Sequence, residues 1–311
     1  MAFLYALPGA VAEGLIWGLM AIGVYISYKI LDIADLTVDG SICTGGCVCA
    51  VLLGLGLPAW VCVLAALLAG AITGMVTGLL HTRLGIPSIL AGILTQLMLY
   101  SVNLLILSGK SLVPVDPRAN NLLVHRSNNP RPILVMAIIV MATIFVLYEF
   151  FYTQIGLTLK STGDNPDMSR AQGVDVDRNK VLGLAIANGI VAMAGALLAQ
   201  YKGSANINDG RGAIVIALAA IFIGLSVSLK IKPNFVVSLI GVVSGGIVYY
   251  IVYNFVILLG LKTDYLKMLS AIIVALFLGV PYLKGKYFTK QRDLHPAQII
   301  EQSRKGGNGD A

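Results

Sequence analysis

The chain has 311 residues, of which 57% are hydrophobic and only 12% are charged, and its mean hydropathy is +0.85. A soluble domain carries about 25% charged residues, so this composition excludes an ordinary soluble protein and indicates an integral membrane protein. The net charge of +7 would suggest a nucleic-acid partner for a soluble protein, but in a membrane protein Lys and Arg report topology first. We therefore expect the lipid bilayer as a partner, and no nucleic acid.

Apolar stretches divide the chain into candidate spans, since a helix that crosses the bilayer needs about 20 apolar residues. The predicted fold class is all-α, a polytopic membrane protein with about nine membrane helices. They cover residues 9–31, 40–57, 59–80, 86–107, 133–152, 180–201, 213–229, 234–259 and 265–283. The second and the seventh are short, and broken spans are tolerated only where protein or a water-filled cavity covers the backbone. Such helices often mark a transport pathway.

The two short spans begin in a similar way, which predicts an internal repeat. An apolar run, a proline and a Gly-rich helix follow Asp39-Gly40, and the same order follows Asp209-Gly210. Five spans separate the two starts, so the repeat would be inverted, as in many transporters; chance resemblance between two Gly-rich hairpins is the alternative. In the third span, Gly70, Gly74 and Gly78 are four residues apart and predict a flat ridge on which another helix packs closely.

The cysteines of the chain are Cys43, Cys47, Cys49 and Cys62, and all of them lie inside apolar stretches. Small thiols are common in buried positions, and a metal site would need more polar neighbours. We therefore expect structural thiols and no metal site.

Basic residues predict the sidedness of the spans. One side of the predicted topology holds fourteen of them: Lys29, Arg83, Lys160, Arg170, Arg178, Lys180, Lys230, Lys232, Lys284, Lys286, Lys290, Arg292, Arg304 and Lys305. The other side holds eight: Lys110, Arg118, Arg126, Arg131, Lys202, Arg211, Lys262 and Lys267. The richer side is expected to be cytoplasmic, which places the N-terminus outside and the C-terminus inside. The polar tail at residues 291–311 is expected to be a disordered cytoplasmic segment.

A polar segment at residues 156–180 interrupts the apolar spans on the predicted cytoplasmic side. Asn165 is a suitable N-cap, Pro166 suits the first helical position, and Gly173 can end a helix in the left-handed conformation. These signals predict a short helix of about two turns at Pro166–Gln172, and Asp175 or Asp177 is expected to cap the helix that follows. A stiff surface helix can transmit the motion of a soluble motor; an ordinary solvated connection is the alternative.

Polar side chains inside the spans are costly in lipid and are expected to face the protein interior. On the fourth span the spacing of Gln96, Tyr100 and Asn103 places the three residues on one helix face. Later spans add Asn188, Tyr253 and Asn254. We expect these six residues to line a translocation pathway, with interhelical hydrogen bonding as the alternative reading.

Several segments together carry a resemblance to a known family. The segment GLTLKSTGDNPDMSRAQGVDVDRNKVLGLAIANGIVAMAGALLAQYKG resembles the cytoplasmic loop and following helix of ABC-transporter permeases of the branched-chain amino acid and ribose importer type. Gly163-Asp164-Asn165-Pro166 and Gly173-Val174 stand where that family has its loop motif. The stretches GLIWGLMAIGVYISYKILDIADLTVDGSICTGG and LLHTRLGIPSILAGILT are similar to a tryptophan/tyrosine permease subgroup. The resemblance covers about residues 10–285.

The resemblance implies a function for the whole chain. Residues 1–290 would form the permease domain of an ABC importer in the bacterial inner membrane, a transport subunit and not an enzyme, which passes a small solute inward by alternating access. An amino acid, aromatic or branched-chain, is the expected solute. Coupling to the motor would involve a segment that consists of Gly163, Asp164, Asn165, Pro166, Asp167, Met168, Ser169, Arg170, Ala171, Gln172 and Gly173.

The same resemblance implies partners. They are cytoplasmic ATPase subunits that use ATP and Mg²⁺, an extracytoplasmic substrate-binding protein, and a second permease copy, expected to form a homodimer, with a paired paralogue as the alternative. The chain itself would bind no cofactor. Its sequence contains no GxxxxGK[ST] motif, which agrees with ATP hydrolysis by a partner.

Two alternatives come from other classes of protein. Asp32, Asp35 and Asp39 are spaced to share one face of a helix, as the Mg²⁺ site of an intramembrane prenyltransferase-like enzyme would require. An ion-driven secondary transporter would use membrane carboxylates, for which Glu13 and Glu149 are the candidates, but each lies near a span end where it can reach interfacial water. Solute uptake measured with and without ATP hydrolysis separates these possibilities.

Overall fold

The computed structural model describes residues 2–115, 122–125, 131–228 and 234–258, together with the isolated positions 268, 271, 272, 275 and 279. The helices in these ranges belong to one compact unit, residues 1–274. The predicted tail at 291–311, and the predicted ninth span at 265–283 apart from those isolated positions, lie outside the described residues.

Helices account for nearly all of the described elements. In chain order the elements, helices and two short strands, are α1 (Ala2–Tyr25) with a short π-helical continuation η1 (Ile26–Ile30), α2 (Val38–Gly54), α3 (Ala59–Thr82), α4 (Ser88–Ile106), β1 (Leu112–Pro114), α5 (Arg131–Tyr152), α6 (Gln154–Asp164), α7 (Pro166–Ala171), α8 (Val176–Lys202), β2 (Ser204–Asn206), α9 (Ala213–Ser228) and α10 (Phe235–Leu258). Six helices are long and apolar enough to cross a membrane, namely α1 with η1, α3, α4, α5, α8 and α10. The shorter apolar helices are α2 and α9. Eight of the nine predicted spans thus fall on observed helices, and the second and seventh are short, as predicted.

The strands β1 and β2 correct the all-α prediction in a small way. They pair antiparallel, with Leu112 opposite Asn206 and Pro114 opposite Ser204. The pairing lies beside the end of α8 and inside the stretch that the sequence marked only as a loop. Its effect is to hold the segment that follows α4 against the segment that leads into α9.

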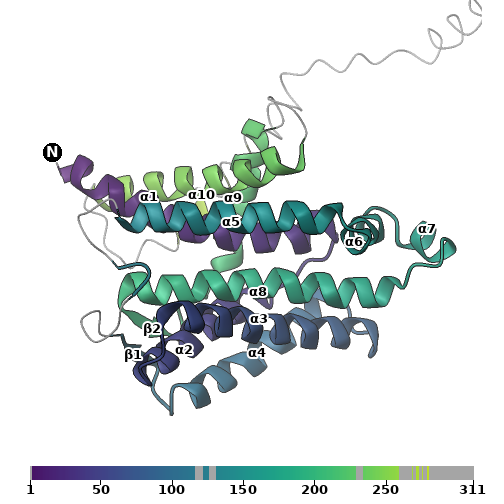
Figure 1. Cartoon of the computed structure of the whole chain (residues 1–311), viewed down its shortest axis with the longest axis horizontal. Helices are drawn as coiled ribbons and strands as arrows, with labels where there is room; N and C mark the ends of the chain where they lie inside the picture. Colours follow the sequence, from purple (N-terminus) through teal and green to yellow (C-terminus); the bar gives the residue numbers. More distant parts are fainter. Residues whose placement is uncertain are drawn as a thin grey trace, which may run out of the picture. The chain divides into compact units, whose positions relative to one another are not determined.

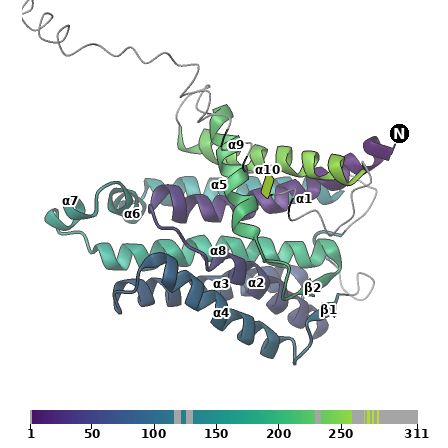
Figure 2. The same cartoon turned by 180° about the vertical axis from the view of Figure 1, so that it is seen from behind.

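The long helices form two groups that lie side by side in Figures 1 and 2. One group contains α1, α5, α9 and α10, and the other contains α2, α3, α4 and α8. The helices α1 and α8 pack on each other and join the groups. In the apolar stretch of α8, 83% of the residues are buried, against 22% in α5. Thus α8 is central, and α5 presents most of its surface to its surroundings.

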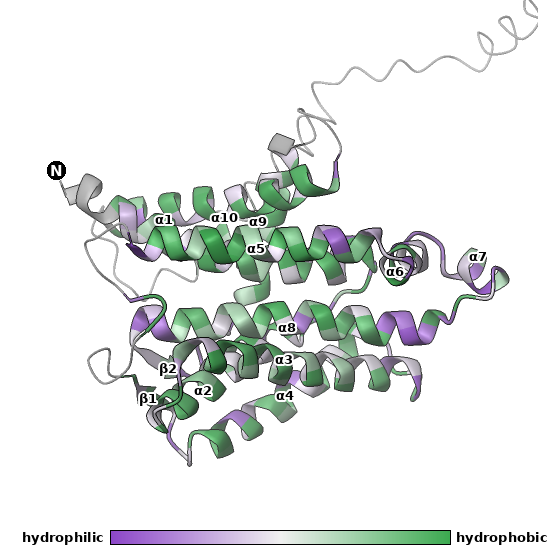
Figure 3. Cartoon of the chain, in the orientation of Figure 1, coloured by the Kyte–Doolittle hydropathy of each residue, from purple (hydrophilic) through white to green (hydrophobic). Residues whose placement is uncertain are grey.

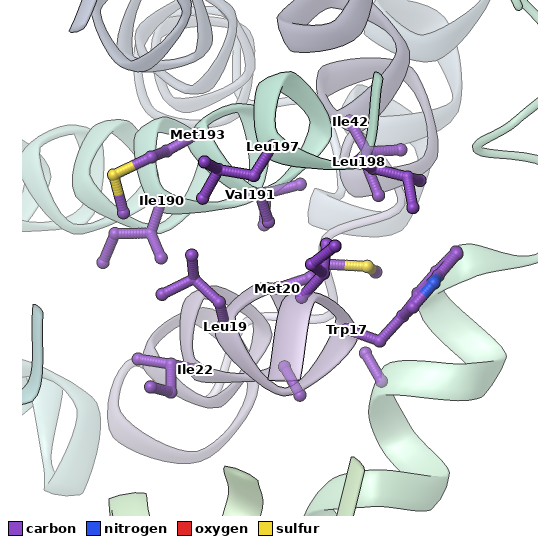
Figure 4. Close-up of a cluster of buried hydrophobic side chains, with 14 of the residues drawn as sticks. Trp17, Leu19, Met20, Ile22, Ile42, Ile190, Val191, Met193, Leu197 and Leu198 are labelled. Carbon is purple, nitrogen blue, oxygen red and sulfur yellow. The ribbon is translucent and has the colours of Figure 1, made fainter. Parts of the chain in front are cut away.

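Interlocking apolar side chains fill the contact between α1 and α8. Figure 4 shows Leu19 and Met20 of α1 pointing toward Val191, Leu197 and their neighbours on α8. Leu19, Met20, Val191 and Leu197 are fully buried. Lipid tails are as apolar as these side chains, so close packing rather than escape from water stabilises the contact.

The contact between α3 and α8 depends on the predicted glycine ridge. Gly70, Gly74 and Gly78 of α3 lie against the backbone of α8, and a Cβ atom at Gly74 would overlap the carbonyl group of Leu184. Only glycine lets the two backbones approach so closely. The prediction of a packing ridge is therefore confirmed, and its partner is the central helix α8.

The described basic residues gather at two opposite ends of the helices. Lys29, Arg83, Lys160, Arg170, Arg178 and Lys180 lie near α6, α7 and the start of α8, and Lys110, Arg131, Lys202 and Arg211 lie toward the end of α8 that carries β2. Figure 3 shows hydrophilic residues at both ends of α8 and along α7, with apolar residues between them. The other twelve basic residues, including Arg118, Lys230 and Lys262, lie outside the described residues. The grouping agrees with the predicted division of charge.

Candidate functional site

A short capped helix, α7, stands at the end of the protein where α6 and α8 meet (Figure 1). The side-chain oxygen of Asn165 accepts a hydrogen bond from the backbone N–H of Met168 at 3.0 Å, and Pro166 is the first helical residue. Gly173 follows the helix with a φ of +82°, the left-handed region that suits glycine. The predicted helix is confirmed, and its last helical residue is Ala171 rather than Gln172, which is the C-cap.

The helix α6 precedes α7 and was not predicted. It begins after Thr153, whose hydroxyl accepts a hydrogen bond from the backbone N–H of Gly156. Its residues mix apolar and polar types too evenly to be recognised as a membrane span. The sequence pattern therefore assigned most of them to the polar segment and predicted no helix there. With α6 in place, the polar segment is built of two helices rather than of one helix between loops.

Specific contacts tie α7 to α6, and α6 in turn to α8 and to the end of α1. The Ser169 side chain is buried and its hydroxyl lies 3.3 Å from the hydroxyl of Ser161 on α6. The side-chain amide of Asn179 on α8 donates to the hydroxyl of Thr162 at 3.0 Å. Gly163 lies directly against the backbone of Ile30, so α6 also contacts the end of α1. A displacement of α7 would therefore reach both α1 and α8.

The opposite face of α7 is exposed. Met168 is 59% exposed, and Asp167 and Arg170 form an ion pair of 3.5 Å at the surface. Arg170 also lies 3.7 Å from Asp177 on α8. Exposed ion pairs of this kind contribute little stability, so the exposed apolar and charged groups are available for another molecule. Asp175 rather than Asp177 caps α8, by accepting from the backbone N–H of Arg178 at 3.1 Å.

A cavity of about 250 Å³ lies between α2, α4 and the loop before α9. Three of the predicted pathway residues line it together, as their shared helix face requires: Gln96, Tyr100 and Asn103. Three further lining residues were not among the predicted pathway residues: Asp39, Cys43 and Arg211. The guanidinium carbon of Arg211 lies 6.0 Å from the centre of the Tyr100 ring, within range of a cation–π interaction.

Asp39 ties the start of α2 to the start of α9. One carboxylate oxygen accepts from the backbone N–H of Gly212 and the other from that of Ile214, each at 2.9 Å. The backbone N–H groups at a helix start have no partner within the helix, so Asp39 acts as an N-cap supplied from another helix. Cys43 adds to the same contact by donating to the carbonyl oxygen of Ile207 at 3.2 Å. All four cysteines are free and buried.

Replacing Asp39 with alanine is expected to destabilise the folded protein by about 1–2 kcal/mol, the usual cost of a lost N-cap. The two N–H groups before and within α9 would lose their acceptor, and α9 would loosen from α2. The thermal unfolding midpoint of the detergent-purified chain measures the effect. Glu149→Ala is the matched control, because Glu149 is an exposed carboxylate near the end of α5 and exposed substitutions stay within about 0.5 kcal/mol. Equal midpoints for both variants would contradict the capping role.

Asn188 does not line this cavity. It is fully buried near the middle of α8, where its amide nitrogen donates to the carboxylate of Asp35 at 2.6 Å and its amide oxygen accepts from Ser41 at 2.7 Å. Thr73 and further threonines of α3 and α4 extend the network. Its geometry is that of interhelical hydrogen bonding, the alternative that the sequence left open.

Tyr253 and Asn254 lie in the other group of helices. Tyr253 lines a second cavity of about 370 Å³, together with Trp17, Tyr250 and, again, Arg211. Trp17 and Tyr250 stack with their ring centres 5.7 Å apart. Asn254 lines neither of these two cavities and donates to the carbonyl oxygen of Tyr250 on its own helix. Arg211 is therefore the side chain shared by the polar cavity and the aromatic one.

The expected helical face of Asp32, Asp35 and Asp39 does not exist, so that prediction is wrong. The chain leaves the helix after η1, and Asp32 has a φ of +54°, outside the right-handed helical region. Asp32 is exposed, Asp35 is buried against Asn188, and Asp39 caps α9. Sequence spacing fails here because it assumes one continuous helix, and the carboxylates serve three separate environments.

Comparison with known proteins places this architecture in a family. Residues 9–278 match the family model described as branched-chain amino acid transport system / permease component. The chain is 37% identical to a tyrosine transport system permease protein of Clostridioides difficile, over 86% of this chain and 88% of that one. It is 25% identical to the ribose import permease protein of Escherichia coli, over 83% of this chain and 79% of the relative.

A galactose/methyl galactoside import permease protein of Haemophilus influenzae is 26% identical, over 73% of this chain and 68% of its own length. No solved structure matches the chain. The family match covers most of the helices described above, including α7 and the helices around the cavity. The chain therefore belongs to the family of branched-chain amino acid transport system permease components, and it is a multi-pass permease subunit of an ABC importer, not an enzyme.

Proposed function

We propose that this permease carries an amino acid, aromatic or branched-chain, into the bacterial cell across the inner membrane. The observation that carries the proposal is the similarity, along nearly the whole of both chains, to a relative named for tyrosine transport. The aromatic cavity with Trp17, Tyr250 and Tyr253 is compatible with such a solute. The more distant relatives named for ribose and galactose import make a sugar the second candidate.

The surface helix α7 is the proposed coupling helix, with the segment from Gly163 to Gly173 as the docking site of the ATPase. Its support is threefold: two caps make it stiff, its outer face exposes Met168, and its inner face is bonded to α6, which is itself bonded to α8. A stiff element transmits a rigid-body displacement that a floppy loop would absorb. ATPase closure would push α7, and α8 would carry the motion to the cavity beside α2.

The sidedness and assembly follow from the same proposal. The end with α7 faces the cytoplasm and the N-terminus lies outside, as the division of basic residues favours. Residues 1–290 form the permease domain, with about nine spans. Two identical copies are proposed to pair, with cytoplasmic ATPases that use ATP and Mg²⁺ and with an extracytoplasmic protein that delivers the solute. This chain binds no cofactor.

The proposed inverted repeat has support from the two short helices. Each follows an Asp-Gly pair, at Asp39-Gly40 and at Asp209-Gly210. Their starts meet in the interior, because Asp39 caps α9 and Gly210 lies against the Asp39 backbone. Short helices that begin inside the membrane domain and meet near a cavity are typical of transporters built from inverted repeats.

Uptake by the reconstituted complex tests the function. Vesicles that contain the permease, its ATPases and its binding protein are expected to accumulate radiolabelled L-tyrosine or L-leucine with ATP, and not with a non-hydrolysable ATP analogue. D-Ribose and D-galactose are measured in parallel. Import of a sugar without any amino acid would overturn the proposed solute class, and ATP-independent uptake by the isolated permease would overturn the proposed mechanism.

A further inference from the structure

We propose that the cavity lined by Asp39, Gln96, Tyr100, Asn103 and Arg211 recognises the zwitterionic head of an amino acid. In this site Arg211 binds the carboxylate group of the solute, and the side-chain oxygen of Asn103 accepts a hydrogen bond from its ammonium group. The inference rests on the proposed function, since it names the chemical groups of the solute that the permease itself binds. It adds Arg211 and Asp39, which lie outside the predicted pathway set.

The first observation is that the side chain of Arg211 lines the cavity without a carboxylate partner among the described residues. Its side chain is exposed and lines the cavity, where the Tyr100 ring is its neighbour. The nearby carboxylates are occupied: Asp209 holds Lys202 at 3.1 Å, and both oxygens of Asp39 accept backbone N–H groups. Arg211 forms no ion pair with any residue that the structure describes. Its planar guanidinium group is thus open for the bidentate pairing that carboxylates favour.

The second observation is that the buried side-chain oxygen of Asn103, on α4 at the same cavity, lacks a hydrogen-bond donor among the described residues. Only 1% of this residue is exposed, and its side-chain oxygen has no hydrogen-bond partner within the described part of the chain. A buried acceptor without a donor costs stability, so such groups in native proteins call for an explanation. An ammonium group, which has three donors, supplies what this oxygen lacks.

The charges and size of the cavity fit the same solute. Arg211 and Asp39 place opposite charges in one cavity, which matches a zwitterion. At about 250 Å³ the cavity is smaller than the roughly 300–1,000 Å³ typical of sites for drug-sized ligands. The shared position of Arg211 lets a solute with its carboxylate on this residue extend an aromatic side chain toward Trp17 and Tyr250 in the second cavity.

Two variants test the site by uptake of radiolabelled L-tyrosine in vesicles that contain the full complex. Arg211→Gln is expected to lower uptake about tenfold or more, since a charge-assisted hydrogen bond is lost, and Arg211→Lys, which keeps the charge, is expected to fall between that variant and the wild type. Arg131→Gln is the matched control, because Arg131 is an exposed arginine at the start of α5, outside the cavity. Its uptake should equal that of the wild type.

Asn103→Leu separates recognition from structure. Replacing an amide whose buried oxygen has no partner by an apolar group of similar size should leave the thermal midpoint unchanged or raise it, while uptake falls about tenfold. Wild-type uptake by both Arg211→Gln and Asn103→Leu would overturn the inference and leave the proposed function intact. Import of a sugar and of no amino acid by the wild type would overturn the proposed function, and the inference with it.

Discussion

Replacing Gly74 with leucine is expected to separate α3 from α8 and to cost about 3 kcal/mol or more of folding free energy. A side chain at this position would overlap the backbone of Leu184, which cannot move aside as a flexible side chain would. Because α8 also packs against α1 and α2, a displaced α3 would disturb both groups of helices. The thermal midpoint and the yield of monodisperse protein after detergent extraction measure the loss.

Gly54→Leu is the matched control for this substitution. Gly54 is the last residue of α2, and a Cβ atom there would meet nothing within 4 Å. The control should extract and unfold like the wild type, because it has the same change in volume without a facing backbone. A wild-type midpoint for Gly74→Leu would contradict the close contact between α3 and α8.

Asp164→Lys is expected to uncouple ATP hydrolysis from uptake while the permease stays folded and inserted. Asp164 is exposed at the end of α6, directly before the N-cap of α7. Lysine at this position reverses the charge that the ATPase meets between α6 and α7. Uptake by the reconstituted complex should fall at least about tenfold, a coupling loss of about 1.4 kcal/mol, while ATPase activity remains.

Two comparison variants sharpen this prediction. Gly173→Val should uncouple in the same way, because valine at a φ of +82° is strained and shifts the end of α7. Glu149→Lys makes the same charge reversal at an exposed site near the end of α5, away from α7, and should keep coupled uptake. Normal coupling in both Asp164→Lys and Gly173→Val would remove α7 from the proposed role.

The sequence predicted the helices well where one local property decides them. The length of each apolar stretch located eight helices, and the residues Asn165, Pro166 and Gly173 located α7 to within one residue. It missed α6 because a short helix of mixed polarity has no long apolar run, although Thr153 is a suitable N-cap residue at its start. It misread Asp32, Asp35 and Asp39 because the break after η1 depends on tertiary packing.

The polar residues of the cavity were predicted only in part, because local spacing relates residues of one helix and not residues of different segments. Gln96, Tyr100 and Asn103 share one face of one helix, so their spacing alone brings them together. Arg211 and Asp39 are 172 residues apart in the chain, so no local spacing relates them. Asn188 was a reasonable polar candidate, but only its partners show that it joins helices instead of lining this cavity.

By itself, the sequence determined that the chain is a polytopic helical membrane protein, which family it resembles, where most helices run and where α7 begins. These properties depend on hydrophobic length, caps and local motifs, which act over a few residues. Only the tertiary structure decided that Asp39 caps α9, that α3 packs on α8 through glycine, and that Arg211 faces Tyr100 and Asn103 across one cavity. Such pairings depend on which helix faces meet, and that is set by close packing between distant segments rather than by local pattern.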